Sequence, residues 1–557
     1  MNDSTEKIPR RQALKLMSAA TIATFLEPQL LLAEDTVRIA GRLCKIVAST
    51  VSAHTVRLRI TEQQPAKVSD DGAVVLDMPS RTAREVAPNG SKKSLRVAIS
   101  HGPLTFHITS SDGRQVQQLR IDENTGAVTF PLGDGAVLGM GEGGPQFDRR
   151  GNTDRMRSGQ GGYRLRTHGG RVPIQWLIGV SGWAMFIHQP LGSFDLTGSD
   201  GQFSTNDSTA ALPLDIFIVD AREPSVAMAE YARITGQPEM PPLWSLGYQQ
   251  SHRTIASREE ILSIAQTFRE KKLPCDALIY LGTGFCPSGW NTENGSFQFN
   301  PRVFSDPKEI IDQFHAMNFR VVMHVVILTR TLLGAAADPC RLERFDAADV
   351  GCYWDAHRKD FALGVDGWWP DEGDPLDAPS RLTRNRMYYE APQLDRPNQR
   401  PYALHRNGYA GMQRYASFLW SGDVYSTWET LRNHVPIGIN TGLSGIPLWG
   451  TDTGGFVPTK DFTGELYVRW FQFSAFCPLF RSHGRDWKLR LPWGWNTGEL
   501  GPNEISNYSE AANPDPSELH NPDVEPICRK YLELRYRLLP YLYTAVRENH
   551  DLGLPIM

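Results

Sequence analysis

The chain has 557 residues, of which 40% are hydrophobic and 22% are charged, a composition typical of globular proteins. This length exceeds that of one ordinary domain and predicts two or three. The formal net charge is −4, and the basic residues neither form runs nor alternate with aromatic residues, which argues against a nucleic-acid-binding protein.

The first 33 residues have the layout of an export signal. A basic segment is followed by a short apolar run and by a small-residue cleavage site after Ala33. The pair Arg10-Arg11 resembles the start of a twin-arginine signal. We therefore expect a periplasmic or secreted protein, with a frayed amphipathic terminus as the alternative. No later stretch reaches about 20 uninterrupted apolar residues, so we expect no contact with a membrane.

The seven cysteines are odd in number and scattered along the chain, at positions 44, 275, 286, 340, 352, 477 and 528. Their spacing does not match any metal-binding motif, and the histidines do not form a His-x-x-x-His pair. We expect mostly buried thiols, and the sequence predicts neither a metal ion nor a cofactor.

Residues 34–235 have the alternation of apolar and polar residues that is typical of β-strands. Val56, Leu58 and Ile60 form one such run, and further runs follow near residues 95, 104, 116 and 128, separated by turn residues. This pattern predicts an N-terminal antiparallel β-sandwich. The Gly-rich residues 133–151 interrupt it, and we expect a loop there.

The pattern changes after residue 235. The box Ser257-Arg258-Glu259-Glu260 opens a predicted helix, residues 276–282 form a predicted strand, and a second helix and strand follow at 305–319 and 320–326. Strands and helices that alternate at this spacing indicate parallel β-structure with crossover helices. We therefore predict a catalytic (β/α)8 TIM barrel over residues 236–557, which makes the chain a multidomain β plus α/β protein.

Five successive predicted strands end in a charged or polar side chain. In chain order these residues are Asp371, Arg406, Asp423, Asp452 and His483. Taken singly, each is explained by a solvated loop or by a structural ion pair. Together they predict an active site, because the carboxyl ends of barrel strands meet at one face of the barrel.

The residue types at these strand ends fit the chemistry of glycoside hydrolysis. One carboxyl group has to be protonated to assist the leaving oxygen, and a second has to be ionised at the anomeric carbon. Trp420, three residues before Asp423, is placed to raise the pKa of that acid by desolvation. We expect Arg406 and His483 to keep Asp371 ionised and to bind sugar hydroxyls. Four aromatic side chains near the strand ends are candidates for substrate contact: Trp369, Trp420, Trp449 and Phe456.

Asp371 belongs to an acidic cluster, GVDGWWPDEGDP (364–375), that follows a buried strand. Such clusters are usually solvated loops. Because Asp371 alone falls at the strand end, we expect it to be the catalytic carboxylate, with Glu372 and Asp374 serving the loop. Asp366 lies earlier in the same segment, away from the strand end, and is expected to be structural.

The chain resembles glycoside hydrolase family 31, the retaining α-glycosidases, over nearly all of its length after the export signal. The similar segments are GVDGWWPDEGDP (364–375), RNGYAGMQRYASFLWSGD (406–423), GLSGIPLWGTDTGGF (442–456), ELYVRWFQFSAFCPLFRSHG (465–484), LGMGEGGPQFDRRG (138–151), ITGQPEMPPLWSLGYQQS (234–251) and YRLLPYLYTAVRENHDLGLPIM (536–557). The resemblance implies that Asp371 is the nucleophile and Asp423 the acid/base. It also implies that Arg406 and His483 contact the sugar in the −1 subsite and that Asp452 supports them.

The sequence departs from the family pattern in two places. Members of the family usually continue past Gly-x-Pro-Ile-Met into C-terminal β-sandwiches, which we expect to be absent here. The second barrel strand usually ends in an Asp that binds sugar hydroxyls, whereas Gly282 stands at that place. The possible substitutes in the following loop are Thr283, Trp290, Asn291 and Glu293.

The leading hypothesis is a retaining exo-α-glycosidase that acts on an oligosaccharide or glycoside. A transglycosylase or a lyase of the same family is the first alternative, and product analysis separates these activities. A non-catalytic carbohydrate-binding protein is the second alternative, and it would show no turnover. The sequence predicts no oligomeric state.

Overall fold

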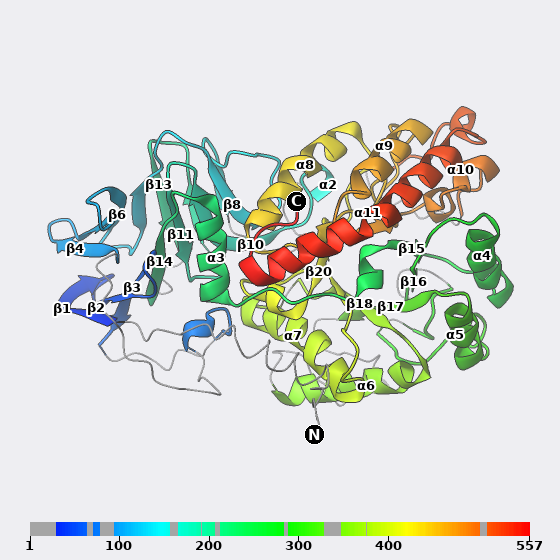
Figure 1. Cartoon of the computed structure of the whole chain (residues 1–557), viewed down its shortest axis with the longest axis horizontal. Helices are drawn as coiled ribbons and strands as arrows, with labels where there is room; N and C mark the ends of the chain where they lie inside the picture. Colours follow the sequence, from blue (N-terminus) through cyan, green and yellow to red (C-terminus); the bar gives the residue numbers. More distant parts are fainter. Residues whose placement is uncertain are drawn as a thin grey trace, which may run out of the picture.

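A computed structural model gives the fold of the chain. It describes residues 29–63, 71–77, 94–155, 165–190, 192–205, 212–282, 288–293, 295–327, 347–374, 376–501 and 510–557. Antiparallel sheets come first in the chain, and parallel strands that alternate with helices follow (Figure 1). The expected export signal lies outside the described residues except for the start of β1 (Gln29–Ile39), a strand that contains Ala33.

Two seven-stranded antiparallel sheets form the N-terminal part. The first has the order β1, β2 (Arg42–Thr50), β3 (Thr55–Glu62), β14 (Leu214–Asp220), β11 (Trp183–Ile187), β10 (Val172–Gly179) and β8 (Val137–Glu142). The second has the order β4 (Arg96–Ser100), β5 (Thr105–Thr109), β6 (Gln115–Ile121), β7 (Val128–Pro131), β13 (Asp200–Ser204), β12 (Ser193–Asp195) and β9 (Thr153–Arg155). Apolar side chains of both sheets form one buried cluster, which includes Val56 and Leu58 of β3 and Phe106 of β5.

Residues 133–151 are not a continuous loop, contrary to the expectation from their glycine content, because β8 lies within them and pairs with β10. A Cβ atom on Gly139 would lie 2.5 Å from the carbonyl oxygen of Trp176, and one on Gly141 would lie 2.0 Å from that of Val172. Both glycines also have positive φ angles. Glycine is therefore required here by close packing of the two strands.

The second part contains two parallel sheets. Five strands form one of them, in the order β18 (Gly367–Glu372), β17 (Arg320–Ile327), β16 (Ala277–Tyr280), β15 (Tyr248–His252) and β22 (Phe480–Ser482). The other contains β19 (Leu404–His405), β20 (Phe418–Trp420) and β21 (Trp449–Gly450). Isolated parallel bridges link the edges of the two sheets, one between Trp368 and Ala403 and one between Asp452 and Arg481.

Helices follow these strands and lie outside them (Figure 1). They are α4 (Arg258–Glu270), α5 (Pro307–Ala316), α6 (Ala347–Leu363), α7 (Ala378–Asp395), α8 (Trp428–Leu443), α9 (Gly464–Ser474), α10 (Gly494–Thr497) and α11 (Val524–Leu552). The expected start of α4 is present, since Ser257 Oγ accepts a hydrogen bond from the N–H of Glu260. Among the described residues, no helix is both long and apolar enough to cross a membrane.

Strand β8 joins the N-terminal sheets to helix α8. The N–H of Gly139 donates to Asn440 Oδ1 at 2.7 Å, and that of Gly141 donates to Ser444 Oγ at 2.7 Å. At the end of β8, Glu142 accepts a 2.8 Å hydrogen bond from the indole of Trp449. Burial raises the pKa of Glu142 to about 8, so its carboxyl group is protonated at neutral pH.

The described cysteines follow the sequence-based expectation with one exception. The buried free thiols are Cys44, Cys275, Cys477 and Cys528. Cys352 is disulfide-bonded, which the expectation of mostly buried thiols allows. Cys286 and Cys340 lie outside the described residues.

Candidate active site

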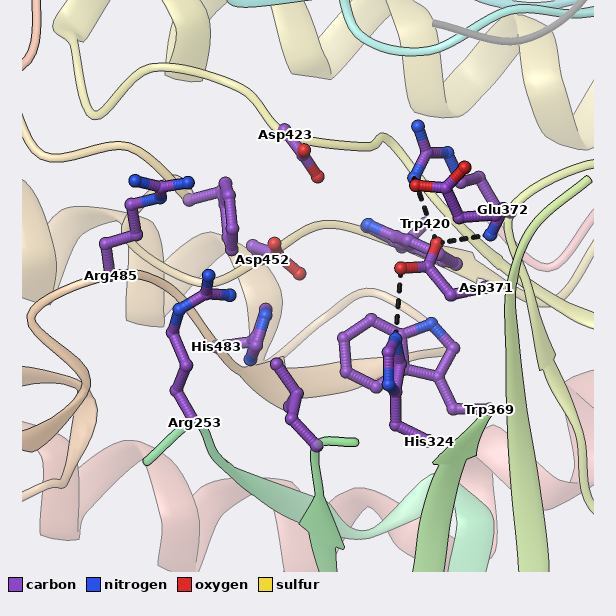
Figure 2. Close-up of a pocket in the computed structure, with 13 residues that line it drawn as sticks. Arg253, His324, Trp369, Asp371, Glu372, Trp420, Asp423, Asp452, His483 and Arg485 are labelled. Carbon is purple, nitrogen blue, oxygen red and sulfur yellow. Dashed lines mark hydrogen bonds and ion pairs between the residues drawn. The ribbon is translucent and has the colours of Figure 1, made fainter. Parts of the chain in front are cut away.

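A cavity of about 190 Å³ lies at the carboxyl ends of the parallel strands. The residues at its wall are Arg253, Leu281, His324, Trp369, Asp371, Glu372, Arg406, Trp420, Asp423, Asp452, Phe456, His483 and Arg485 (Figure 2). All five predicted strand-end residues are in this set. The structure therefore brings together five predicted side chains that span 112 positions of the chain, from Asp371 to His483.

Asp371 is held by three hydrogen-bond donors. Its Oδ1 atom accepts from Arg406 Nη1 at 3.1 Å and from the N–H of Glu372 at 2.8 Å, and its Oδ2 atom lies 3.0 Å from His324 Nε2. Burial alone would raise the pKa of Asp371, but the charge of Arg406 and the contact with His324 hold it far below its usual range. Asp371 is therefore ionised at all ordinary pH values.

The backbone after Asp371 is in a strained conformation. Glu372 has a φ angle of +56°, which costs a residue other than glycine about 1–3 kcal/mol. The guanidinium of Arg384, on α7, donates to the carbonyl oxygen of Asp371 at 2.6 Å and to that of Glu372 at 2.8 Å. The side chain of Asn407 donates to the second carbonyl at 2.9 Å. These bonds fix the turn that directs the Asp371 carboxylate into the pocket.

Asp423 has the opposite electrostatic setting. Burial raises the pKa of Asp423, the nearby charge of Asp371 raises it further, and the charge of Arg406 opposes both effects. One carboxyl group of the pocket is thus held ionised, while the other takes up a proton more readily than an ordinary Asp. Such a pair suits acid/base work on one side of a reacting centre and nucleophilic attack on the other.

Aromatic rings form much of the pocket wall. The rings of Trp369 and Trp420 meet edge to face with centroids 5.2 Å apart, and His483 stacks on Phe456 at 5.3 Å. Trp449 does not line the pocket, contrary to the sequence-based expectation. Its side chain is 1% exposed and donates to Glu142 in the core between β8 and α8. A two-residue strand gives no alternation from which this orientation follows.

A buried ion pair supports the aromatic wall from behind. Arg481 on β22 donates to Asp452 Oδ1, and both side chains are fully buried. The Arg481 guanidinium carbon lies 4.3 Å from the ring centroid of Trp369 and 5.3 Å from that of Trp420. Asp452 therefore lines the pocket and also fixes the cation that packs against the two indole rings.

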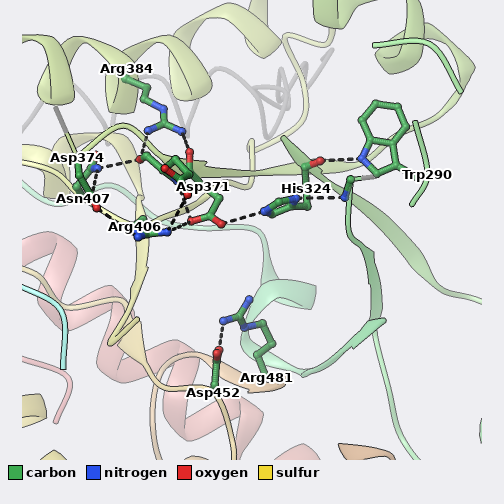
Figure 3. A network of polar contacts seen from close by, with 11 residues as sticks. Trp290, His324, Asp371, Asp374, Arg384, Arg406, Asn407, Asp452 and Arg481 are labelled. Carbon is green, nitrogen blue, oxygen red and sulfur yellow. Dashed lines mark hydrogen bonds and ion pairs between the residues drawn. The ribbon is translucent and has the colours of Figure 1, made fainter. Parts of the chain in front are cut away.

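Arg406 contacts Asp371 as expected, but the histidine that does so is not the expected one. His483 lines the pocket, but the histidine that contacts the carboxylate is His324 (Figure 3). Burial, together with the nearby charge of Arg481, lowers the pKa of His483 well below its usual value, so this ring is neutral. His324 was missed because it lies inside an apolar strand, RVVMHVV, where a single histidine is not a signal of function.

Two further arginines were missed by sequence reasoning. Arg253 follows β15 and Arg485 follows β22, and Figure 2 shows both across the pocket from Asp371. Their guanidinium carbons lie 5.4 and 5.6 Å from the ring centroid of Phe456. Arg253 follows a strand of polar and small residues, YQQSH, that has no apolar run to mark its end.

The other three acidic residues of the cluster differ in where they lie relative to the pocket. Asp366 lies outside the pocket and binds His315, Arg320 and the N–H of Val321, as expected for a structural residue. Asp374 serves the loop through a 3.2 Å contact with Arg406. Glu372 was expected to serve the loop only, but it lines the pocket.

The substitutes suggested for the missing carboxylate at Gly282 do not line the pocket where they are described. Trp290 is buried and donates to the carbonyl oxygen of His324 at 2.7 Å, and Asn291 is buried and donates to that of Ser296 at 2.8 Å. Glu293 is exposed, and Thr283 lies outside the described residues. Within the described part of the chain, no group of three His, Cys, Asp or Glu side chains is arranged to hold a metal ion.

Comparisons with known proteins identify the family of the parallel part of the chain. The family model for the glycosyl hydrolases family 31 TIM-barrel domain matches residues 238–331 and 341–545. An α-xylosidase from Saccharolobus solfataricus is 28% identical over 393 residues, which cover 62% of this chain and 48% of that protein. Alpha-glucosidase 2 from Bacillus thermoamyloliquefaciens is 28% identical over 401 residues, which cover 62% of this chain and 46% of that protein. The chain thus spans about half the length of these curated relatives.

Solved structures share the fold. A dextranase of this family from Flavobacterium johnsoniae superposes with a TM-score of 0.73 at 22% identity, covering 96% of this chain and 71% of that one. An α-xylosidase from a soil metagenome superposes with a TM-score of 0.71 at 19% identity, covering 95% and 86%. The arrangement of sheets and helices is therefore that of known sugar-processing enzymes.

Proposed function

This chain belongs to glycosyl hydrolase family 31, and on that premise we propose that it is a retaining exo-α-glycosidase. The observation that carries the proposal is the pairing of Asp371 and Asp423 in one pocket, with the pKa of the first lowered and that of the second raised. A double displacement needs these two states of two neighbouring carboxyl groups.

In the first step Asp371 attacks the anomeric carbon while Asp423 gives its proton to the departing oxygen. In the second step Asp423 takes a proton from water, which attacks the same carbon and releases Asp371. Arg406 keeps Asp371 ionised before the attack through its 3.1 Å contact and stabilises the carboxylate again when it is released. The product of two inversions retains the anomeric configuration.

The size of the pocket supports removal of single terminal sugars. Its volume of about 190 Å³ is below the roughly 300–1,000 Å³ of pockets that hold drug-sized ligands. The fold proposed around it is a closed (β/α)8 barrel with an N-terminal β-sandwich. The bridges from Trp368 to Ala403 and from Asp452 to Arg481 support closure at both seams between the parallel sheets.

The sugar that fits best is proposed to be other than a plain α-glucoside. At the end of β16 the pocket is lined by Leu281 and not by Gly282, so this strand end supplies no carboxylate for the hydroxyls of the sugar. The suggested substitutes that are described do not line the pocket. A site without a paired acceptor discriminates poorly for the usual configuration. An α-galactoside or a modified or branched α-glycoside is therefore expected to react faster.

The test compares kcat/KM for aryl α-glucoside, α-xyloside and α-galactoside, and follows the anomeric configuration of the first product by NMR. A retained configuration supports the double displacement, and an inverted one contradicts it. A clear preference for the glucoside contradicts the proposed specificity. Longer oligosaccharides would instead identify a transglycosylase, and an unsaturated sugar would identify a lyase.

We also propose export of the protein by residues 1–33. The support is the basic segment with Arg10-Arg11, the apolar run and the small residue Ala33 at the expected cleavage site. Replacement of Arg10 and Arg11 by Lys should retain the protein in the cytoplasm of a bacterial host, as measured by fractionation. Unchanged export would contradict the twin-arginine assignment.

A further inference from the structure

His324 binds the Asp371 carboxylate with one ring nitrogen and a backbone amide with the other. Nε2 lies 3.0 Å from Asp371 Oδ2, and Nδ1 accepts a 3.2 Å hydrogen bond from the N–H of Gly282. Because a backbone N–H only donates, Nδ1 carries no proton and the ring proton lies on Nε2. Burial lowers the pKa of His324, although the Asp371 carboxylate opposes this. His324 is therefore a neutral donor to the carboxylate.

The ring of His324 has little freedom to move. Its side chain is 1% exposed, and it meets the ring of Trp369 edge to face with centroids 4.5 Å apart. The backbone is fixed as well, since the indole of Trp290 donates to the carbonyl oxygen of His324 (Figure 3). The Nε2–H group is thus held in place before a substrate binds.

The two oxygens of Asp371 have different partners. Oδ1 accepts hydrogen bonds from the cationic Arg406 and from the backbone of Glu372, whereas Oδ2 accepts from the neutral His324. In an ester the carbonyl oxygen remains a good hydrogen-bond acceptor, and the bridging oxygen becomes a weak one. Oδ1 is therefore suited to become the carbonyl oxygen and Oδ2 to form the bond to the sugar.

We propose that His324 is a positioning residue that selects Oδ2 as the attacking atom and stabilises the Asp371 carboxylate when it leaves in the second step. The inference rests on the proposed role of Asp371 as nucleophile. In the first step Oδ2 bonds to the anomeric carbon, the glycosidic bond breaks, and the leaving oxygen takes the proton of Asp423. In the second step the oxygen of water bonds to that carbon, Asp423 takes the proton, and the electron pair of the C–Oδ2 bond returns to Asp371.

The hydrogen bond from His324 differs in strength between these states. It is charge-assisted when Asp371 is a carboxylate and weaker when Oδ2 is the bridging oxygen of an ester. It therefore lowers the barrier of the second step, in which the carboxylate re-forms, and does not assist the first, in which the carboxylate is consumed. Removing it should slow release of the sugar from Asp371 by about 10- to 100-fold, the range expected for a hydrogen bond to a charged group.

The experiment compares His324→Met, which removes the donor, with His324→Gln, whose amide retains one. The substrate is the fastest aryl α-glycoside of the panel, in a form with a dinitrophenyl leaving group so that the second step limits turnover. In His324→Met, kcat and KM should both fall by about 10- to 100-fold while kcat/KM does not fall, and a burst of phenol should appear. His324→Gln should recover at least part of kcat.

A second measurement follows the second step alone. The corresponding 2-deoxy-2-fluoroglycosyl fluoride traps the sugar on the enzyme, and mass spectrometry identifies the labelled residue and its rate of release. Release should be slower in His324→Met than in the unaltered protein. The matched control is His315→Met, which removes a similar 2.8 Å contact with Asp366 outside the pocket and should leave the release rate unchanged.

Two results would overturn the inference. One is release from Asp371 at the same rate in His324→Met and in the unaltered protein. The other is an equal fall of kcat and kcat/KM in both His324 variants, which would indicate a general loss of structure. Labelling of a residue other than Asp371 would instead contradict the proposed function itself.

Discussion

The guanidinium of Arg384 donates a 2.6 Å hydrogen bond to the backbone carbonyl of Asp371. A second bond, to the carbonyl of Glu372, makes this buried arginine the link between α7 and the strained turn after β18. The direction of the Asp371 carboxylate thus depends on a side chain that does not line the pocket. This arrangement predicts that the pocket is sensitive to changes behind its wall.

Arg384→Met should lower both stability and kcat. The substitution removes a donor from the carbonyl oxygen of Asp371 and leaves that of Glu372 with Asn407 as its donor, so the free energy of unfolding should fall by about 1–3 kcal/mol. Urea denaturation and kinetics on the best aryl α-glycoside measure the two effects. The control is Arg358→Met on α6, where an exposed ion pair contributes at most about 1 kcal/mol. Unaltered kcat in Arg384→Met would contradict the positioning role.

Asp371→Ala should reduce turnover below about a hundredth of that of the unaltered protein, because covalent catalysis does not survive loss of its nucleophile. The fold should remain intact, as measured by circular dichroism and thermal unfolding. Azide should not restore a product of retained configuration. Asp195→Ala, at the exposed end of β12, is the control and should keep full activity. A higher residual turnover would show that another group attacks the sugar.

Asp423→Ala should spare the first step for substrates with good leaving groups, which need no proton, and azide should accelerate the second step. The pH profile carries the same information. Asp423 acts as an acid only while protonated, so activity on poor leaving groups should fall as pH rises through its raised pKa. In the variant this basic limb should disappear. Equal losses for good and poor leaving groups without azide rescue would exclude this role.

The N-terminal sheets should become less stable as pH rises towards 9. His188 lies between Asp71 and Asp215, at 2.9 and 3.1 Å, and Asp215 also pairs with Arg57. Burial alone would lower the pKa of His188, but hydrogen bonds to the two carboxylates raise it to about 9. The folded state therefore holds a proton that the unfolded state releases near pH 6.5, about its usual value.

The contribution of the His188 proton to the free energy of unfolding is complete below about pH 6.5 and is lost as pH rises through 9. It amounts to at most about 3 kcal/mol. Urea midpoints between pH 6 and 10 measure it, and His188→Gln should flatten their decline. His54→Gln, in an exposed turn, should leave the decline unaltered. A decline of equal slope in His188→Gln would show that other groups cause it.

The predictable part of the site is the part that stands at strand ends. Asp371, Asp423 and Asp452 each follow an apolar or aromatic run, so the sequence shows that each stands at the end of a predicted strand. His324 and Arg384 carry no such signal, because the first lies within an apolar strand and the second within a polar helix. Their roles come from contacts between distant segments, which a single sequence does not contain.

The fold likewise contains elements that the sequence predicts and elements that it does not. Strands such as β3 and β5 follow from alternation, and the start of α4 follows from its capping box. Strand β8 was missed because glycine disfavours strands locally, and the reason for glycine there is the approach of β10. Trp449 was misplaced for a similar reason, since its partner Glu142 lies 307 positions away in the chain.

The junction of β8 and α8 bears on any attempt to exchange domains between this protein and its relatives. One apolar cluster contains Trp176 and Phe186 of the antiparallel sheet together with Leu419, Ile437 and Trp449 of the parallel part. A graft cut near residue 235 would expose both halves of this cluster to water and separate Glu142 from its indole partner. The antiparallel sheet that contains β8 and the parallel part should therefore be transferred together. A hybrid protein needs both halves of this cluster from the same parent.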